Sequence, residues 1–217
     1  MIYHLLYPLH TSISAFNVFR YITFRTIYAS LTAFLICFLL GPWLIRRLNA
    51  LRVGQPIREI GPDHAAKAGT PTMGGLLILF AVITSTLLWA QLDNGYVWLT
   101  MVTTAFFGFI GALDDYKKIS IKSSDGLSAR GKLLLQILGA AVVGVFIILA
   151  PNFDSHLAIP FFKDIRPDLG WFYVVFAIIV IVGASNAVNL TDGLDGLATG
   201  PTVVSAAVYL IFSYIAG

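Results

Sequence analysis

Two adjacent carboxylates, Asp114 and Asp115, stand at the end of a long apolar run and are followed by Lys117 and Lys118. Ionisable groups at the edge of the membrane hydrocarbon cost free energy, so their presence there suggests a function. Two aspartates at a helix C-terminus are also unfavourable by about 0.3 to 1 kcal/mol each, because the helix dipole is negative at that end. Mg²⁺ would offset this charge, since it binds carboxylate and phosphate oxygens. The alternative is a solvated helix end that the two lysines neutralise.

A second group of polar side chains recurs at every third position: Asn186, Asn189, Asp192 and Asp195. Neighbours in this series share a helix face, but the row drifts by about 60° per step, so the ends of a continuous helix would point apart. Glycines next to both aspartates predict a break in the helix, and a bend would let all four side chains converge. Broken backbone at membrane depth is tolerated where it lines a polar cavity. The alternative is a polar turn with one Asp as N-cap, which fits two Asn, one Thr and two Asp poorly.

The third group is the segment 67–75, Lys-Ala-Gly-Thr-Pro-Thr-Met-Gly-Gly, which includes Lys67 and Thr72 and leads into another apolar run. Glycine-rich backbone, hydroxyl groups and a lysine near a helix N-terminus suit an anionic ligand. The segment lacks the order of a Walker P-loop, and a capped helix start explains it equally well. The three groups together predict phosphoryl chemistry between a soluble, nucleotide-like substrate and a membrane lipid.

The elements that must position these residues are membrane helices. Apolar residues make up 58% of the 217 residues and charged residues only 12%, whereas soluble domains carry about 25% charged residues. The mean hydropathy is +0.83. A crossing helix needs about 20 apolar residues, and barrel strands would alternate instead. We therefore expect an all-α polytopic membrane protein, residues 1–217 forming one transmembrane domain, with six apolar runs: Ile27–Ile45, Met73–Ala90, Tyr96–Leu113, Leu133–Ala150, Trp171–Val188 and Leu197–Ala216.

The distribution of basic residues predicts the orientation. Ten Lys and Arg residues lie in the segments that follow the first and third runs, whereas four lie in the N-terminal segment and in the segment that follows the fourth run. Basic loops stay in the cytoplasm, so the N-terminus is expected outside. Cytoplasmic loops are then expected at about 46–72, 114–132 and 189–196, and all three polar groups map to the cytoplasmic side.

At these residues the sequence resembles the bacterial phospho-N-acetylmuramoyl-pentapeptide transferases. The similar strings are Lys67 with the Gly69–Gly75 segment, Asp114-Asp115-Tyr116, the 186–197 segment and the external Pro160-Phe-Phe-Lys-Asp164. They occur in order, and the similarity runs from about residue 17 to the end of the sequence. The paired aspartates are shared with the wider superfamily of polyprenyl-phosphate sugar-1-phosphate transferases, whereas the other strings indicate the muramoyl-pentapeptide branch.

The resemblance implies transfer of phospho-MurNAc-pentapeptide from UDP-MurNAc-pentapeptide to undecaprenyl phosphate. The products are lipid I and UMP, and the reaction needs Mg²⁺. It implies metal and catalytic roles for Asp114, Asp115 and Asp192. It also implies substrate-binding roles for the remaining polar positions: Lys67, Thr72, Lys132, Asn186, Asn189 and Asp195. The expected location is the bacterial cytoplasmic membrane with the active site facing the cytoplasm. No nucleic acid is expected as a partner, and the family leaves a homodimer open.

The sequence departs from the family in one respect. Members have more membrane helices than the six expected here, and a further aspartate and a histidine-rich loop that follow them do not occur in the 217 residues. We therefore expect a truncated part of such an enzyme. The alternatives are a transferase of the UDP-GlcNAc type, a catalytically incomplete fragment, and a transporter or channel. The transporter is disfavoured because the carboxylates gather on one side of the membrane.

Overall fold

A computed structural model of the chain describes residues 1–50, 73–121, 126–151, 153–162, 164–192 and 197–216. These residues form helices and contain no β-strand. Four of the helices are long and apolar enough to cross a membrane, and two further apolar helices are shorter. The four are α2 (Ile22–Ala50), α4 (Gly95–Ile121), α5 (Ala129–Ile148) and α6 (Phe172–Thr191), and the shorter two are α3 (Gly75–Trp89) and α7 (Thr199–Ala216). Each predicted apolar run overlaps one of these helices, so the expectation of an all-α polytopic membrane protein is confirmed.

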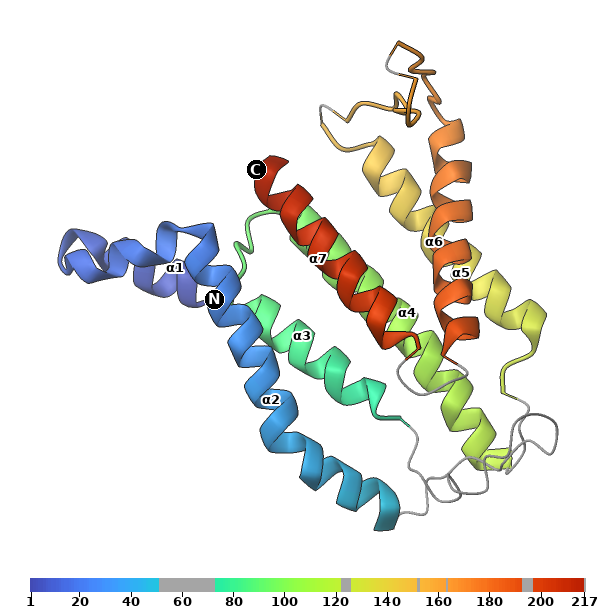
Figure 1. Cartoon of the computed structure of the whole chain (residues 1–217), viewed down its shortest axis with the longest axis horizontal. Helices are drawn as coiled ribbons and strands as arrows, with labels where there is room; N and C mark the ends of the chain where they lie inside the picture. The colour runs from blue at the N-terminus through green and yellow to red at the C-terminus, as the bar shows by residue number, and fades with distance from the viewer. Residues whose placement is uncertain (51–72, 122–125, 152, 163, 193–196, 217) are drawn as a thin grey trace. The chain divides into compact units, whose positions relative to one another are not determined.

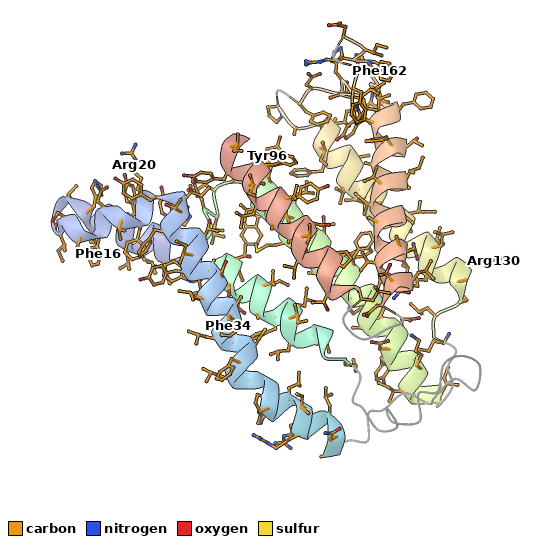
Figure 2. All side chains as sticks on the ribbon, viewed as in Figure 1. Phe16, Arg20, Phe34, Tyr96, Arg130 and Phe162 are labelled. Carbon is orange, nitrogen blue, oxygen red and sulfur yellow. The ribbon has the colours of Figure 1, made fainter. Side chains whose placement is uncertain are left out.

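The chain divides into two compact units, Met1–Leu135 and Gln136–Gly217, with the boundary inside α5. In the first unit α3 lies between α2 and α4, as Figure 1 shows. In the second unit α5 and α6 pack closely at Gly144, where an added Cβ would lie 3.1 Å from the Cα atom of Val174. Small residues allow such close approach of membrane helices, which pack without a hydrophobic driving force. Apolar side chains cover the outside of the helices, and Phe34 of α2 is 65% exposed (Figure 2).

Helix α4 continues further than its apolar run predicts. The sequence places the end of this helix at Leu113, whereas the helix ends at Ile121, about two turns later. Asp114 and Asp115 therefore lie within the helix, and their expected position at its C-terminus is wrong. An apolar run shows only which part of a helix suits the membrane hydrocarbon. The backbone hydrogen bonds of the helix can continue beyond that part, as they do in α4 up to Ile121. The predicted loop 114–132 shortens accordingly, because α5 begins at Ala129.

The N-terminal segment forms α1 (Ile2–Leu6) and two 3₁₀ helices, η1 (Tyr7–Thr11) and η2 (Ser14–Arg20). The Met1 ammonium group donates hydrogen bonds to the carbonyl oxygens of Leu87, at 2.6 Å, and Leu88, at 3.2 Å. These carbonyls belong to the last turn of α3, whose oxygens have no partners within the helix. A positive charge at this negative end of the helix dipole is favourable. The N-terminal segment thus caps α3.

Candidate functional site

The Asp114 carboxylate is the centre of a charged cluster between α4 and α5. Its Oδ2 atom lies 2.7 Å from Nζ of Lys118, one turn later in α4, and 4.0 Å from Nζ of Lys132 in α5. Its Oδ1 atom accepts a hydrogen bond of 2.8 Å from the backbone N–H of Leu127. Both oxygens of this carboxylate therefore have cationic or N–H partners. A buried carboxylate needs such partners, because an unpaired charge away from water costs several kcal/mol of stability.

The neighbouring Asp115 has a different environment. Its side chain is 32% exposed, compared with 12% for Asp114. Its Oδ1 atom lies 3.5 Å from Nζ of Lys118, a longer separation than that between Lys118 and Asp114. Successive helix positions point in directions about 100° apart, which explains how adjacent aspartates come to differ. Asp115 is thus the carboxylate that a ligand from solution can reach more easily.

Helix α5 begins in a way that brings Lys132 to the cluster. Ser128 precedes the helix, and its Oγ atom accepts a hydrogen bond of 3.3 Å from the N–H of Gly131. This is the usual N-cap interaction, in which a serine hydroxyl satisfies an N–H of the first turn. The N–H of Lys132 donates to the carbonyl oxygen of Ser128 at 2.9 Å, which closes the first turn. The cap therefore sets the position from which the Lys132 side chain extends toward Asp114.

A second polar cluster, made of Gln136, Ser185 and Asn186, joins α5 to α6. The Asn186 amide donates to Oε1 of Gln136 at 2.8 Å and to the carbonyl oxygen of Val182 at 2.9 Å. The Gln136 amide donates to the Ser185 hydroxyl at 3.4 Å, and Gln136 is 3% exposed. Polar side chains commonly hydrogen-bond across membrane helices in this way. Sequence reasoning missed Gln136, although a lone glutamine inside the apolar run from Leu133 was a detectable signal.

The remaining predicted residues fall into two groups. Asn189 and Asp192 are exposed at the end of α6, where the helix ends at Thr191. The helix therefore ends close to the break that the glycines predict. The expected convergence of four side chains stays a prediction: Asn186, Asn189, Asp192 and Asp195. Three predicted site residues lie outside the described residues: Lys67, Thr72 and Asp195.

The donor chemistry of the first cluster suits a hard divalent cation in part. Among the described residues, no group of three or more His, Cys, Asp or Glu side chains is placed to hold a metal ion. Asp115 offers partly exposed carboxylate oxygens of the kind that Mg²⁺ binds together with water and phosphate. Asp114 already faces two lysines, as the alternative of lysine neutralisation predicts for Lys118. The metal roles of Asp114, Asp115 and Asp192 therefore stay predictions, and Asp115 fits best.

The long apolar helices and the charged cluster on α4 and α5 define a polytopic membrane protein with a polar site. Residues 97–217 match the model of glycosyl transferase family 4, and residues 67–79 match signature 1 of phospho-N-acetylmuramoyl-pentapeptide-transferase. The chain belongs to glycosyl transferase family 4.

Curated relatives carry the same name as the signature. The chain is 66% identical to the phospho-N-acetylmuramoyl-pentapeptide-transferase of Desulfotalea psychrophila over 218 aligned residues, which cover 100% of this chain and 61% of the relative. It is 60% identical to the protein of that name from Desulfosudis oleivorans and 58% identical to the one from Syntrophus aciditrophicus, with the same two coverages. The chain thus spans about three fifths of the length of these relatives. The resemblance stated from the motifs is confirmed.

Proposed function

We propose that this chain contributes the active site of a phospho-N-acetylmuramoyl-pentapeptide transferase. In the proposed reaction, an oxygen of undecaprenyl phosphate attacks the sugar-side phosphorus of UDP-MurNAc-pentapeptide. The phosphorus–oxygen bond within the diphosphate breaks, and UMP leaves with the bridging oxygen. The products are UMP and lipid I, which is a precursor of peptidoglycan.

The observation that carries this proposal is the cluster that Asp114, Asp115 and Lys118 in the last turns of α4 form with Lys132 in the first turn of α5. All four residues lie inside the stretch that matches the glycosyl transferase family. Phosphoryl transfer needs mainly positioning and neutralisation of charge on the phosphate oxygens. Lysines supply positive charge, and carboxylates hold a cation that neutralises more. A site at the end of a span is also where a lipid phosphate and a soluble nucleotide can meet.

Electrostatic stabilisation is the main catalytic contribution that these residues offer. The lipid phosphate is largely ionised at neutral pH, so general-base catalysis matters less than preorganised positive charge. Mg²⁺, when bound, would neutralise charge on the diphosphate, and Asp115 is the proposed main protein ligand. Further ligand roles for Asp114 and Asp192 are proposed from the motifs alone. Lys132 would contact a phosphate oxygen of the nucleotide. The attraction of Asp114 holds the ammonium group of Lys132 at the cluster.

The other substrate contacts are proposed from the motifs. Asn186 uses its amide N–H groups on Gln136 and Val182, so its Oδ1 atom is the one offered to a ligand. The remaining proposed contacts to the uridine and the phosphates come from two motifs far apart in the sequence: Lys67, Thr72, Asn189 and Asp195. We further propose that the protein lies in the bacterial cytoplasmic membrane and that this site faces the cytoplasm, in keeping with its basic loops.

The experiment that tests the proposal measures Mg²⁺-dependent release of UMP from UDP-MurNAc-pentapeptide in micelles that contain undecaprenyl phosphate. Two proteins are compared: the 217-residue chain, and a completed chain in which these residues are joined to the part of the Desulfotalea psychrophila relative that they do not cover. We expect UMP release from the completed chain. Omission of undecaprenyl phosphate is the control, because a transferase needs its acceptor whereas a hydrolase does not.

The outcomes separate the candidate functions. Release of UMP by both proteins would mean that residues 1–217 contain a sufficient site. Release of UMP from UDP-GlcNAc but not from UDP-MurNAc-pentapeptide would contradict the proposed substrate and favour the superfamily alternative. If the completed chain released no UMP from either sugar nucleotide, the assignment as a sugar-phosphate transferase would be wrong.

A further inference from the structure

Gly126 lies against the Asp114 carboxylate, in the connection that leads into α5. An added Cβ atom at Gly126 would overlap Oδ1 of Asp114 and would lie 2.7 Å from its Cγ atom. The same Cβ would lie 2.9 Å from Cε of Lys118. Real Cβ atoms essentially never approach other atoms so closely, so a side chain here requires a displacement. The connection can therefore reach the carboxylate because residue 126 has no side chain.

The displacement that alanine would force acts on the cluster itself. The long Lys118 side chain can move at small cost because several of its bonds rotate. Asp114 is short, and its oxygens are held by Lys118 and by the N–H of Leu127, the residue that follows Gly126. Either the carboxylate rotates away from the loop or the loop moves away from the carboxylate. Both movements break the hydrogen bond from Leu127 to Asp114.

We propose that Gly126 is a positioning residue that acts through Asp114. It lets residues 126 and 127 lie against the carboxylate, so that the Leu127 N–H fixes one oxygen while Lys118 and Lys132 face the other. The catalytic consequence of this placement rests on the proposed function. In that function, a fixed Asp114 keeps Asp115 in place for Mg²⁺ and Lys132 in place for a phosphate. Gly126 itself touches no substrate.

The first test measures the coupling between Gly126 and Asp114 in the 217-residue chain in nanodiscs. Four variants are compared with the unchanged chain: Gly126→Ala, Asp114→Ala, the double variant, and the control Gly111→Ala. Gly111 lies one turn before Asp114 in α4, and an added Cβ there meets nothing within 4 Å among the described residues. Hydrogen exchange at the Leu127 amide and the thermal unfolding midpoint are measured for each.

We expect Gly126→Ala to speed exchange at Leu127 about tenfold or more, because the amide loses a charged acceptor. The unfolding midpoint should fall by about 3 °C or more. In the Asp114→Ala background the same change should have less than half of this effect, since residues in contact are not additive. Gly111→Ala should leave the exchange of Leu127 unchanged.

The second test uses the completed chain and separates positioning from simple loss of folded protein. We expect Gly126→Ala to raise the Mg²⁺ concentration for half-maximal UMP release about tenfold, because a misplaced Asp114 weakens the cation site. A smaller folded fraction would lower the maximal rate and leave this concentration unchanged. Gly111→Ala should change neither quantity.

Two outcomes would overturn the inference while leaving the proposed function intact. One is exchange at Leu127 that is the same in Gly126→Ala and Gly111→Ala. The other is an unchanged Mg²⁺ dependence in an active Gly126→Ala enzyme. If the unmodified completed chain releases no UMP while the Gly126–Asp114 coupling is present, the proposed function fails and the placement of Asp114 by Gly126 stands.

Discussion

Among the described residues, the α4–α5 cluster around Asp114 can be compared with a cluster of charged side chains in the loop between α5 and α6. In the loop, both the ring and the backbone N–H of His156 contact the Asp154 carboxylate. Asp168 accepts hydrogen bonds from the Ser155 hydroxyl and from the backbone N–H of Gly170. Asp154, His156 and Asp168 are exposed, whereas Asp114 is buried.

The comparison shows how burial changes the effect of similar ionic contacts. Exposed ion pairs contribute about 0 to 1 kcal/mol, because water solvates each partner equally well when they separate. The loop contacts can therefore open at small cost. Around Asp114, opening would leave a buried carboxylate without its partners, so the contacts hold Leu127 and the first turn of α5 against α4. A buried cluster can thus keep the fixed geometry that catalysis requires.

The largest expected difference between the two regions is in turnover. Asp115→Asn in the completed chain should lower kcat by about 10³-fold, because it removes a carboxylate from the proposed metal and phosphate site. Asp168→Asn in the loop should leave kcat within about twofold, since surface changes away from a site have small effects. UMP release measures both. Membrane insertion of both variants is the control, and near-normal turnover of Asp115→Asn would reject its catalytic role.

A smaller difference is expected in stability. Asp114→Asn should lower the free energy of unfolding by about 2 kcal/mol, because Asp114 is buried and the half-buried Lys118 ammonium loses its closest acceptor. Asp154→Asn is the matched change in the exposed loop and should have almost no effect. Thermal unfolding in nanodiscs compares the two variants. Equal midpoints would show that burial does not distinguish the clusters.

The neutral cluster between α5 and α6 sharpens the comparison, because its central side chain, Gln136, is buried but uncharged. Gln136→Leu should lower stability by about 1 kcal/mol, since Asn186 and Ser185 lose their partner. The double change of Gln136 and Asn186 to Leu should recover part of this loss, because both polar partners are then removed. Unfolding midpoints of the two single variants and the double variant test this. A double loss equal to the sum of the single losses would contradict coupling.

The smallest expected effect is the pH dependence of the exposed loop. Contact with the Asp154 carboxylate raises the pKa of His156, and contact with His156 lowers the pKa of Asp154. The hydrogen bond from Ser155 lowers the pKa of Asp168. The carboxylate contribution is complete above the ordinary Asp pKa of 3.8 and is lost as pH falls through the lowered values. The His156 contribution is complete below the ordinary pKa of 6.5 and is lost as pH rises through the raised value.

The loop contacts should therefore be strongest between pH 3.8 and 6.5. NMR titration of the His156 ring checks the pKa direction, and Asp154→Asn should return the pKa toward its ordinary value. A His156 pKa that does not respond to Asp154→Asn would show that the two side chains do not pair in solution.

Local sequence patterns predicted the elements and the positions of most polar groups. Apolar runs located each membrane helix, and the spacing of Asp114 and Lys118 places them one turn apart on any α-helix. The error at the end of α4 arose because hydropathy reports the thickness of hydrocarbon, whereas the helix ends where its backbone bonds end. Asp192 at the end of α6 followed from the glycines after it.

By itself, the sequence determined the membrane class, the helices and the motifs that relate this chain to its family, because these depend on short-range order in composition and spacing. Only the tertiary structure decided that Leu127 and Lys132 meet Asp114, that Gly126 must lack a side chain, and that Asn186 pairs with Gln136. It also decided that the N-terminal ammonium caps α3. These contacts join residues from different elements, so they depend on how helices pack and connect, which no local pattern encodes.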